Sequence, residues 1–62
     1  MTAEELGDFL DGVLHGENVN GRLLVVEWSQ QGEDRAVLVF HLQAVGNAVG
    51  GESFLVTIEK EG

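Results

Sequence analysis

Carboxylates at helical spacing are the first residues in this chain that can do chemistry. Near its start, acidic residues follow one another at steps of one or three positions, and a further acidic pair lies in the middle of the chain. Side chains three or four residues apart share one side of a helix, so such an array can bind a basic surface and can imitate the phosphates of a nucleic-acid strand. The predicted partner-binding carboxylates are Glu4, Glu5, Asp8, Asp11, Glu33 and Asp34.

The overall charge favours the same kind of partner. Eleven acidic residues stand against three basic ones, Arg22, Arg35 and Lys60, and the formal net charge is −8. Such a surface repels nucleic acid and anionic membranes, and it attracts basic protein surfaces. We therefore predict a protein partner with a basic surface, no direct nucleic-acid binding and no membrane binding. The alternative is that the acidity serves only solubility.

A metal site near the expected helix end is considered and not predicted. His15, Glu17 and Asn20 can crowd around a cation, but the chain has no cysteine to complete a zinc site. Residues 18–21 match only a fragment of a calcium loop. We interpret this segment as a capped helix end that leads into a turn.

His41 is the one other candidate for acid–base chemistry. A catalytic base needs an oriented partner and a nucleophile within reach, and in the expected sheet Thr57 lies diagonal to His41. We interpret His41 as an interface residue, whose protonation would make association pH-sensitive. The glycine-rich segment 46–51 lacks the Gly-Lys-Ser/Thr of a phosphate loop and is predicted to be a hairpin connection. No enzyme activity, cofactor or metal is predicted.

The size of the chain limits how these groups can be held. Sixty-two residues make one domain, 1–62, which buries only about 60% of its unfolded surface. Without cysteine there is no disulfide framework, so oligomerisation or partner binding is the expected source of extra stability. No apolar run approaches the roughly 20 residues that span a bilayer, and no signal peptide is visible. We predict a cytoplasmic protein.

Residues 2–15 have the pattern of an amphipathic helix. Thr2 and Glu5 can form a capping box at the start, and Gly16 can end the helix in a left-handed conformation. Gly7 and Gly12 each cost about 1 kcal/mol relative to alanine, which indicates either a close approach to the helix backbone or a weak helix. The apolar stripe predicted to face the core consists of Leu6, Phe9, Leu10, Val13 and Leu14.

Three β-rich segments follow the helix, at residues 22–29, 35–44 and 53–60. Residues 17–21 are predicted to be a loop with a turn at Asn20-Gly21, and 45–51 a longer connection. The fold class is therefore α+β, with an N-terminal amphipathic helix packed on one face of a three-stranded antiparallel sheet in an α-β-β-β meander.

Alternation along the strands predicts which face meets the helix. A three-residue turn at 31–33 would place Trp28 opposite Ala36, and the second hairpin would place Leu42 opposite Phe54. The even positions are all apolar and form the predicted core face: Leu24, Val26, Trp28, Ala36, Leu38, Phe40, Leu42, Phe54, Val56 and Ile58.

The opposite, odd-numbered face of the sheet is also apolar at its centre. In the expected register His41 lies between Leu23 and Leu55, and a single helix cannot cover this second face. An uncovered apolar patch usually marks an association site. The predicted association face consists of Leu23, Val25, Val37, Val39, His41 and Leu55.

Two functional hypotheses result. The first is a non-enzymatic, acidic protein-binding module, similar in size and charge to phage-encoded inhibitors of nucleases and CRISPR complexes that mimic nucleic acid. The second is a homodimeric structural or accessory protein that assembles through the association face, with acidity serving only solubility.

Overall fold

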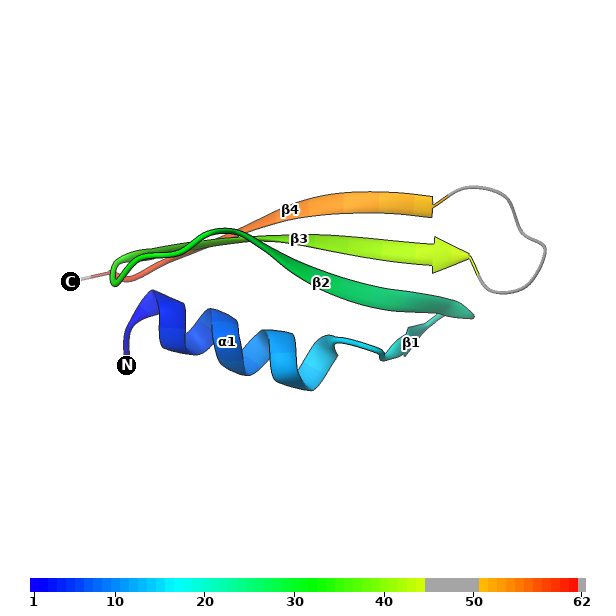
Figure 1. The fold of residues 1–62 in the computed structure, drawn as a ribbon, viewed down its shortest axis with the longest axis horizontal. Helices are drawn as coiled ribbons and strands as arrows, with labels where there is room; N and C mark the ends of the chain where they lie inside the picture. Colours follow the sequence, from blue (N-terminus) through cyan, green and yellow to red (C-terminus); the bar gives the residue numbers. More distant parts are fainter. Residues whose placement is uncertain (45–50, 62) are drawn as a thin grey trace.

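The protein is a helix packed along one face of an antiparallel sheet (Figure 1). The computed structural model describes residues 1–44 and 51–61. Helix α1 (Ala3–Leu14) precedes the strands β1 (Asn18–Val19), β2 (Arg22–Gln30), β3 (Arg35–Ala44) and β4 (Gly51–Glu59), which pair in the order β1-β2-β3-β4. The predicted α+β meander is confirmed, with one strand more than expected. The connection predicted at 45–51 falls largely outside the described residues.

The additional strand, β1, arises from the turn chemistry of Asn20 and Gly21. Both residues have positive φ, 52° and 80°, as a two-residue hairpin of type I′ requires. The Asn18 side-chain oxygen accepts a hydrogen bond from the Gly21 N–H at 3.0 Å. The turn folds Asn18–Val19 back onto the start of β2. The turn prediction is therefore confirmed, whereas the prediction of a loop for all of 17–21 was wrong.

Both ends of α1 form as their residues predict. The Thr2 hydroxyl accepts from the Glu5 N–H at 3.0 Å, and the Thr2 N–H donates to Glu5 Oε1 at 2.8 Å, which completes the capping box. The helix ends at Leu14, and His15 follows as an extended C-cap whose N–H donates to the Asp11 carbonyl. Gly16 comes next and adopts the predicted left-handed conformation, with a φ of +87°.

The side of α1 that faces the sheet agrees with the prediction only in part: Leu14 of the apolar stripe packs against the buried cluster, and Leu10 is partly buried. Ala3 and Gly7 are buried, whereas Leu6, Phe9 and Val13 of the apolar stripe remain exposed, Phe9 by 59%. A Cβ on Gly7 would lie 2.5 Å from Cη2 of Trp28. The helix therefore turns its small residues toward the sheet because the Trp28 ring occupies the space that a larger side chain would need.

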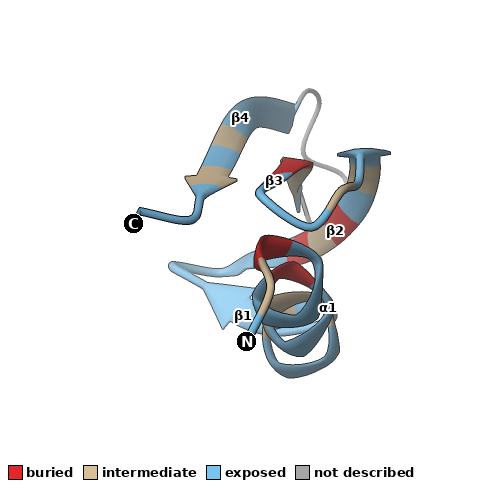
Figure 2. Ribbon diagram, turned by 90° about the vertical axis from the view of Figure 1, so that its left-hand side faces the viewer, coloured by how far each residue is buried: buried red, intermediate tan, exposed pale blue. Residues whose placement is uncertain are grey.

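The main buried cluster lies in the part of the sheet that α1 covers. The buried cluster consists of Ala3 with Leu24, Val26, Ala36 and Leu38. Figure 2 shows buried positions where α1 meets β2 and β3, whereas β4 is drawn as exposed or intermediate. The predicted core face is correct for β2 and β3, but Phe54 on β4 is 50% exposed.

The strand registers are shifted by two residues from those expected. Trp28 lies opposite Leu38 rather than Ala36, and Leu42 lies opposite Glu52 rather than Phe54. The first hairpin contains an irregularity between Trp28 and Gln30, so Gln30 pairs with Val37 and not with Asp34. The extra residue characteristic of a bulge, together with a longer turn, explains the shift.

We predict that Gly7→Ala destabilises the fold whereas Gly12→Ala stabilises it. A methyl group at Gly7 collides with the Trp28 ring, while none of the described atoms lies within 4 Å of a Cβ at Gly12. The expected loss for Gly7→Ala is about 1–3 kcal/mol, and the expected gain for Gly12→Ala is up to about 1 kcal/mol. Urea unfolding followed by circular dichroism measures both. Equal effects of the two substitutions would contradict the close contact.

The capping box also predicts a dependence of stability on pH. The Thr2 N–H, and then the Thr2 hydroxyl, hold the pKa of the Glu5 carboxyl below its ordinary value. The charged form therefore stabilises the fold above the unfolded pKa of about 4.3, and this contribution is lost as the pH falls through the lower folded pKa.

Thermal unfolding of Glu5→Gln should therefore begin at a lower temperature than that of the unmodified protein near neutral pH, and the difference should shrink in acid. Glu4→Gln is the matched control, because it removes a carboxylate of the same helical turn that is not part of the capping box. A difference for Glu5→Gln that stays constant down to about pH 3, below the usual glutamate pKa, would refute this prediction.

Candidate functional site

The start of α1 and the tip of the β2–β3 hairpin meet at one end of the molecule. The Ala3 N–H donates to the Glu33 carbonyl at 2.8 Å, and the Lys60 N–H donates to the Asp34 carbonyl at 2.9 Å. Figure 1 shows this hairpin beside the first turn of α1 and close to the end of β4. These backbone bonds bring together five of the six predicted partner-binding carboxylates. We call this set the acidic end: Glu4, Glu5, Asp8, Glu33 and Asp34.

Asp11, the sixth predicted carboxylate, lies further along α1. Its Oδ1 is 3.9 Å from Nδ1 of His15. The same Nδ1 accepts a hydrogen bond from the Val26 N–H at 3.1 Å, and an acceptor nitrogen cannot also donate a proton to Asp11. The shorter contact therefore decides the role of His15, which connects the end of α1 to β2.

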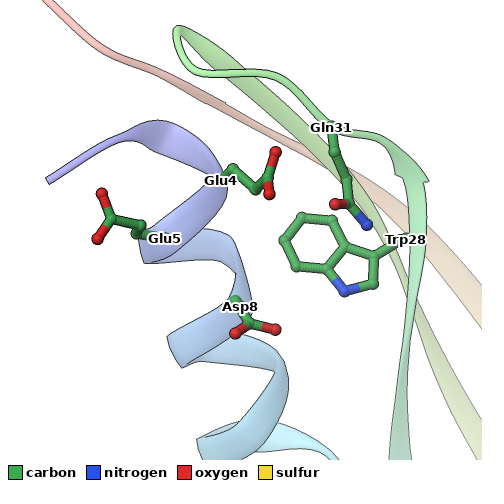
Figure 3. Close-up of a pocket in the computed structure, with 5 residues that line it drawn as sticks. All are labelled: Glu4, Glu5, Asp8, Trp28 and Gln31. Atoms are coloured by element: carbon green, nitrogen blue, oxygen red, sulfur yellow. The ribbon is translucent and has the colours of Figure 1, made fainter.

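A pocket of about 190 Å³ opens at the acidic end, between α1 and the end of β2. Figure 3 shows the carboxylates of Glu4 and Asp8 on the side of the Trp28 indole, Gln31 beside the ring, and Glu5 directed away from it. We call this cavity, lined by Glu4, Glu5, Asp8, Trp28 and Gln31, the Trp28 pocket.

Sequence reasoning missed the part that Trp28 and Gln31 play in this pocket. Trp28 was predicted to lie on the core face, and it does pack against the buried cluster. Its ring is only partly buried, however, and one side of it lines the pocket. The available signal was Gly7, whose lack of a side chain allows the ring to lie against the helix.

The Trp28 pocket has the chemistry of a site for a cationic side chain. Carboxylates form charge-assisted hydrogen bonds with guanidinium and ammonium groups, and an aromatic ring attracts a cation close to its face. The volume of about 190 Å³ is smaller than the roughly 300–1,000 Å³ of typical small-molecule sites. The pocket is therefore suited to a single basic side chain.

A second, more apolar pocket of about 150 Å³ lies between the start of α1 and the end of β4. Leu6 contributes to it from the helix and Ile58 from the strand, and Met1 and Lys60 lie at its sides. Leu6, Phe9 and Val13 are exposed on α1, so the uncovered apolar surface extends along the helix beyond this pocket.

On the association face, the register shift gives His41 different neighbours from those predicted. His41 lies between Val25 and Ser53 instead of between Leu23 and Leu55. Its Nε2 is 2.8 Å from Glu27 Oε2, and its Nδ1 is 2.8 Å from Ser53 Oγ. A hydroxyl group therefore lies beside His41, which the expected register did not show because it placed Leu55 there and Thr57 diagonal to His41.

A carboxylate, an imidazole and a hydroxyl in series have the connectivity of a catalytic triad. Acyl transfer also needs donors aimed at the developing oxyanion, and neither pocket described above is lined by these three residues. Glu27 and Ser53 are exposed on the surface of the sheet. We interpret Glu27, His41 and Ser53 as a polar network that joins three neighbouring strands, and we call it the His41 network.

The other residues of the association face are exposed to different degrees. Leu55 is 69% exposed and Leu23 is also exposed, whereas Val37 is 7% exposed, and Val25 and Val39 are intermediate. The exposed leucines therefore lie at separate places, with the His41 network between them, rather than in one row with His41.

In the described ranges 1–44 and 51–61, no three side chains of His, Asp or Glu are arranged to hold a metal ion. Within the same ranges, no helix is both long enough and apolar enough to pass through a bilayer. Residues 46–50 of the glycine-rich segment lie outside the described part of the chain.

The fold and these sites define the chain as a small α+β domain with an acidic, aromatic pocket at one end. Comparison of the chain with protein-family models, curated proteins and solved structures found no match.

Proposed function

We propose that this protein is a non-enzymatic binding module whose acidic end engages a basic surface on a partner protein. The observation that carries the proposal is the Trp28 pocket, where carboxylates of Glu4 and Asp8 lie beside a partly exposed indole. An acidic surface that serves only solubility does not need an aromatic ring among its carboxylates. A basic side chain from a partner can use both.

The distribution of charge supports this assignment. Arg22 lies 3.7 Å from Glu52 and Arg35 lies 3.9 Å from Glu59, so two of the three basic side chains pair with carboxylates of β4. These pairs are exposed and contribute little to stability. Arg35 follows Asp34 at the hairpin tip, and Lys60 is bonded to the Asp34 carbonyl, so two basic side chains lie at the acidic end. The five carboxylates of the acidic end outnumber them and keep its net charge negative.

Arginine is the side chain that fits this pocket best. Its planar guanidinium can stack on an aromatic ring and bind a carboxylate through two parallel hydrogen bonds. The surrounding carboxylates, Glu5 with Glu33 and Asp34, increase the rate of encounter with a basic partner through long-range attraction. Binding should therefore weaken as salt is added.

The narrower form of the proposal is a phage-type inhibitor that mimics nucleic acid, of the anti-nuclease or anti-CRISPR kind. Its support is the clustering of helix and hairpin carboxylates at one end, since a nucleic-acid-handling protein presents Lys and Arg where phosphates bind. Competition by DNA or RNA for the bound partner distinguishes this form from binding to any other basic protein.

The homodimeric accessory protein is the second candidate function. The observation in its favour is the exposure of Leu55, 69%, together with that of Leu23 on the association face. The His41 network places charge and hydrogen-bonding groups between these leucines. The face therefore offers less continuous apolar contact than its residue types predicted.

The pocket can be tested with a short arginine-rich peptide as the probe. We expect saturable binding that changes Trp28 fluorescence, and Glu4→Gln/Asp8→Asn should weaken it about tenfold at low salt, or about 1.4 kcal/mol. The matched control is Glu17→Gln/Glu61→Gln, which removes the same charge from exposed sites outside the pocket. Isothermal titration calorimetry measures both affinities.

Equal weakening by the pocket pair and the control pair would show that net charge alone attracts the peptide, and the proposal would then fail. A lysine-rich peptide of the same length provides a further comparison. We expect it to bind more weakly, because ammonium groups cannot stack or bind in a bidentate manner.

A further inference from the structure

The two edges of the sheet differ in how many of their backbone groups are hydrogen-bonded within the chain. At the β2 edge, Leu24 donates to the Glu17 carbonyl at 2.8 Å and accepts from the Gly16 N–H at 2.7 Å. The Val26 N–H is bonded to His15 Nδ1, and β1 pairs with the start of the strand. The segment between α1 and β2 therefore occupies much of this edge.

The β4 edge has no such protection among the described residues. Strand β4 is last in the sheet order, and its pairing with β3 runs without a register shift from Gly51 to Glu59. It contains no proline, and both Phe54 and Leu55, which lie on opposite faces, are at least half exposed. Natural edge strands usually carry proline, bulges or central charges that prevent pairing.

The hydrogen bond from the Lys60 N–H to the Asp34 carbonyl shows which groups of β4 point outward. Residues of an antiparallel strand alternate between bonded and non-bonded pairs, and Asp34 and Lys60 continue the β3–β4 register. The even positions of β4 therefore bond to β3. The outward N–H and C=O groups belong to the odd positions, Ser53, Leu55, Thr57 and Glu59.

We propose that this edge of β4 pairs antiparallel with β4 of a second copy of the chain, around a two-fold axis at Val56. The two sheets, of four strands each, would then form one continuous sheet. In this register Phe54 lies opposite Ile58 of the second copy, and Leu55 opposite Thr57. Glu52 lies opposite Lys60, so each end of the new ladder holds a pair of opposite charges.

The occupant is a second copy because the strand complements itself. In this register apolar residues lie opposite apolar residues or a threonine, Glu52 lies opposite Lys60, and Glu59 lies opposite Ser53. No two like charges lie directly opposite each other, an arrangement that would destabilise the pair of strands. Glu52 is within 3.7 Å of Arg22 and is exposed, so it can also reach Lys60 of the second copy.

The antiparallel arrangement also suits the charge of the chain. Each copy carries a formal charge of −8, and repulsion between two acidic ends would oppose association. The acidic end lies where β4 finishes, since Lys60 is bonded to Asp34. An antiparallel pair of β4 strands therefore places the two acidic ends at opposite ends of the dimer and leaves both Trp28 pockets open.

The single chain exposes more surface than a compact monomer of its size, and an interface could bury part of this excess. The chain exposes 4340 Å², compared with about 3,900 Å² expected for a compact monomer of 6.7 kDa. Strand addition obtains much of its affinity from main-chain hydrogen bonds. On the even-numbered face of β4, apolar side chains of the second β4 would also pack against the exposed Phe54.

Sedimentation equilibrium of the full chain, together with single cysteines, tests this proposal. We expect a mass of twice 6.7 kDa at micromolar concentrations. The chain has no cysteine, so each substitution reports on one position. Under mild oxidation Val56→Cys should form a disulfide-linked dimer, because non-bonded opposite residues have Cα atoms about 4.5 Å apart, within the disulfide range.

Ile58→Cys is the matched control on the same strand and face. In the proposed register, Ile58 of one copy is displaced from Ile58 of the other by about 13 Å along the strand, so this variant should not cross-link. A strict monomer would overturn the proposal. Cross-linking through Leu55→Cys instead of Val56→Cys would overturn the register, and cross-linking through Leu23→Cys alone would show stacking through the association face.

Charge exchange provides a second, independent measurement. Lys60→Glu places two carboxylates opposite each other at both ends of the ladder, and it should raise the dimer Kd at least tenfold. The double variant Glu52→Lys/Lys60→Glu restores opposite charges and should recover most of the affinity. Thermal unfolding checks that the variants still fold. A double variant that dimerises as weakly as Lys60→Glu contradicts the register.

Discussion

The contact between Gly7 and the Trp28 ring is the interaction on which most of the structure depends. The indole lies where a Cβ on Gly7 would be 2.5 Å from it, so the helix can approach the sheet only through a residue without a side chain. This contact determines the rotation of α1 about its axis. Ala3 and Gly7 face the sheet, whereas Leu6, Phe9 and Val13 of the stripe are exposed.

The same rotation creates the proposed binding site. With Gly7 against the indole, the neighbouring Glu4 and Asp8 lie beside the ring and form one side of the Trp28 pocket. The same rotation leaves apolar surface exposed at Phe9 and Val13. This exposure lowers the stability of a domain whose core is already small. A partner or a second copy that covers apolar surface would offset this loss of stability.

The tip of the β2–β3 hairpin joins the proposed binding site at the acidic end to the proposed dimer edge on β4. The carbonyls of Glu33 and Asp34 accept from Ala3 and Lys60, so the tip joins the start of α1 to the end of β4. These bonds gather carboxylates that are distant in the sequence into the acidic end. They also hold the end of β4 in register with β3, and the regularity of β4 is the property that makes its outer edge suitable for pairing.

The sequence by itself determined the features that depend on neighbouring residues. The capping box of Thr2 and Glu5, the left-handed Gly16 and the Asn20-Gly21 turn are all formed as predicted, because each is set by hydrogen bonds or backbone preferences within a few residues. The face that most strand residues occupy was also predictable, since side chains alternate along a regular strand; the exception is the irregularity between Trp28 and Gln30.

Only the tertiary structure decided which residues are neighbours across strands and how the helix is rotated. A shift of two residues leaves every side chain on the same face, so alternation cannot distinguish the observed register from the expected one. That shift is what places Ser53, instead of Leu55, beside His41. The apolar stripe likewise predicted the contact side of α1 only in part: Leu14 packs against the core, but Phe9 and Val13 are exposed. The sequence pattern could not show this rotation, because the fit between Gly7 and Trp28 is a contact between residues 21 positions apart. Periodicity measures where apolar residues lie on a helix, and the shape of the opposing surface decides which of them are buried.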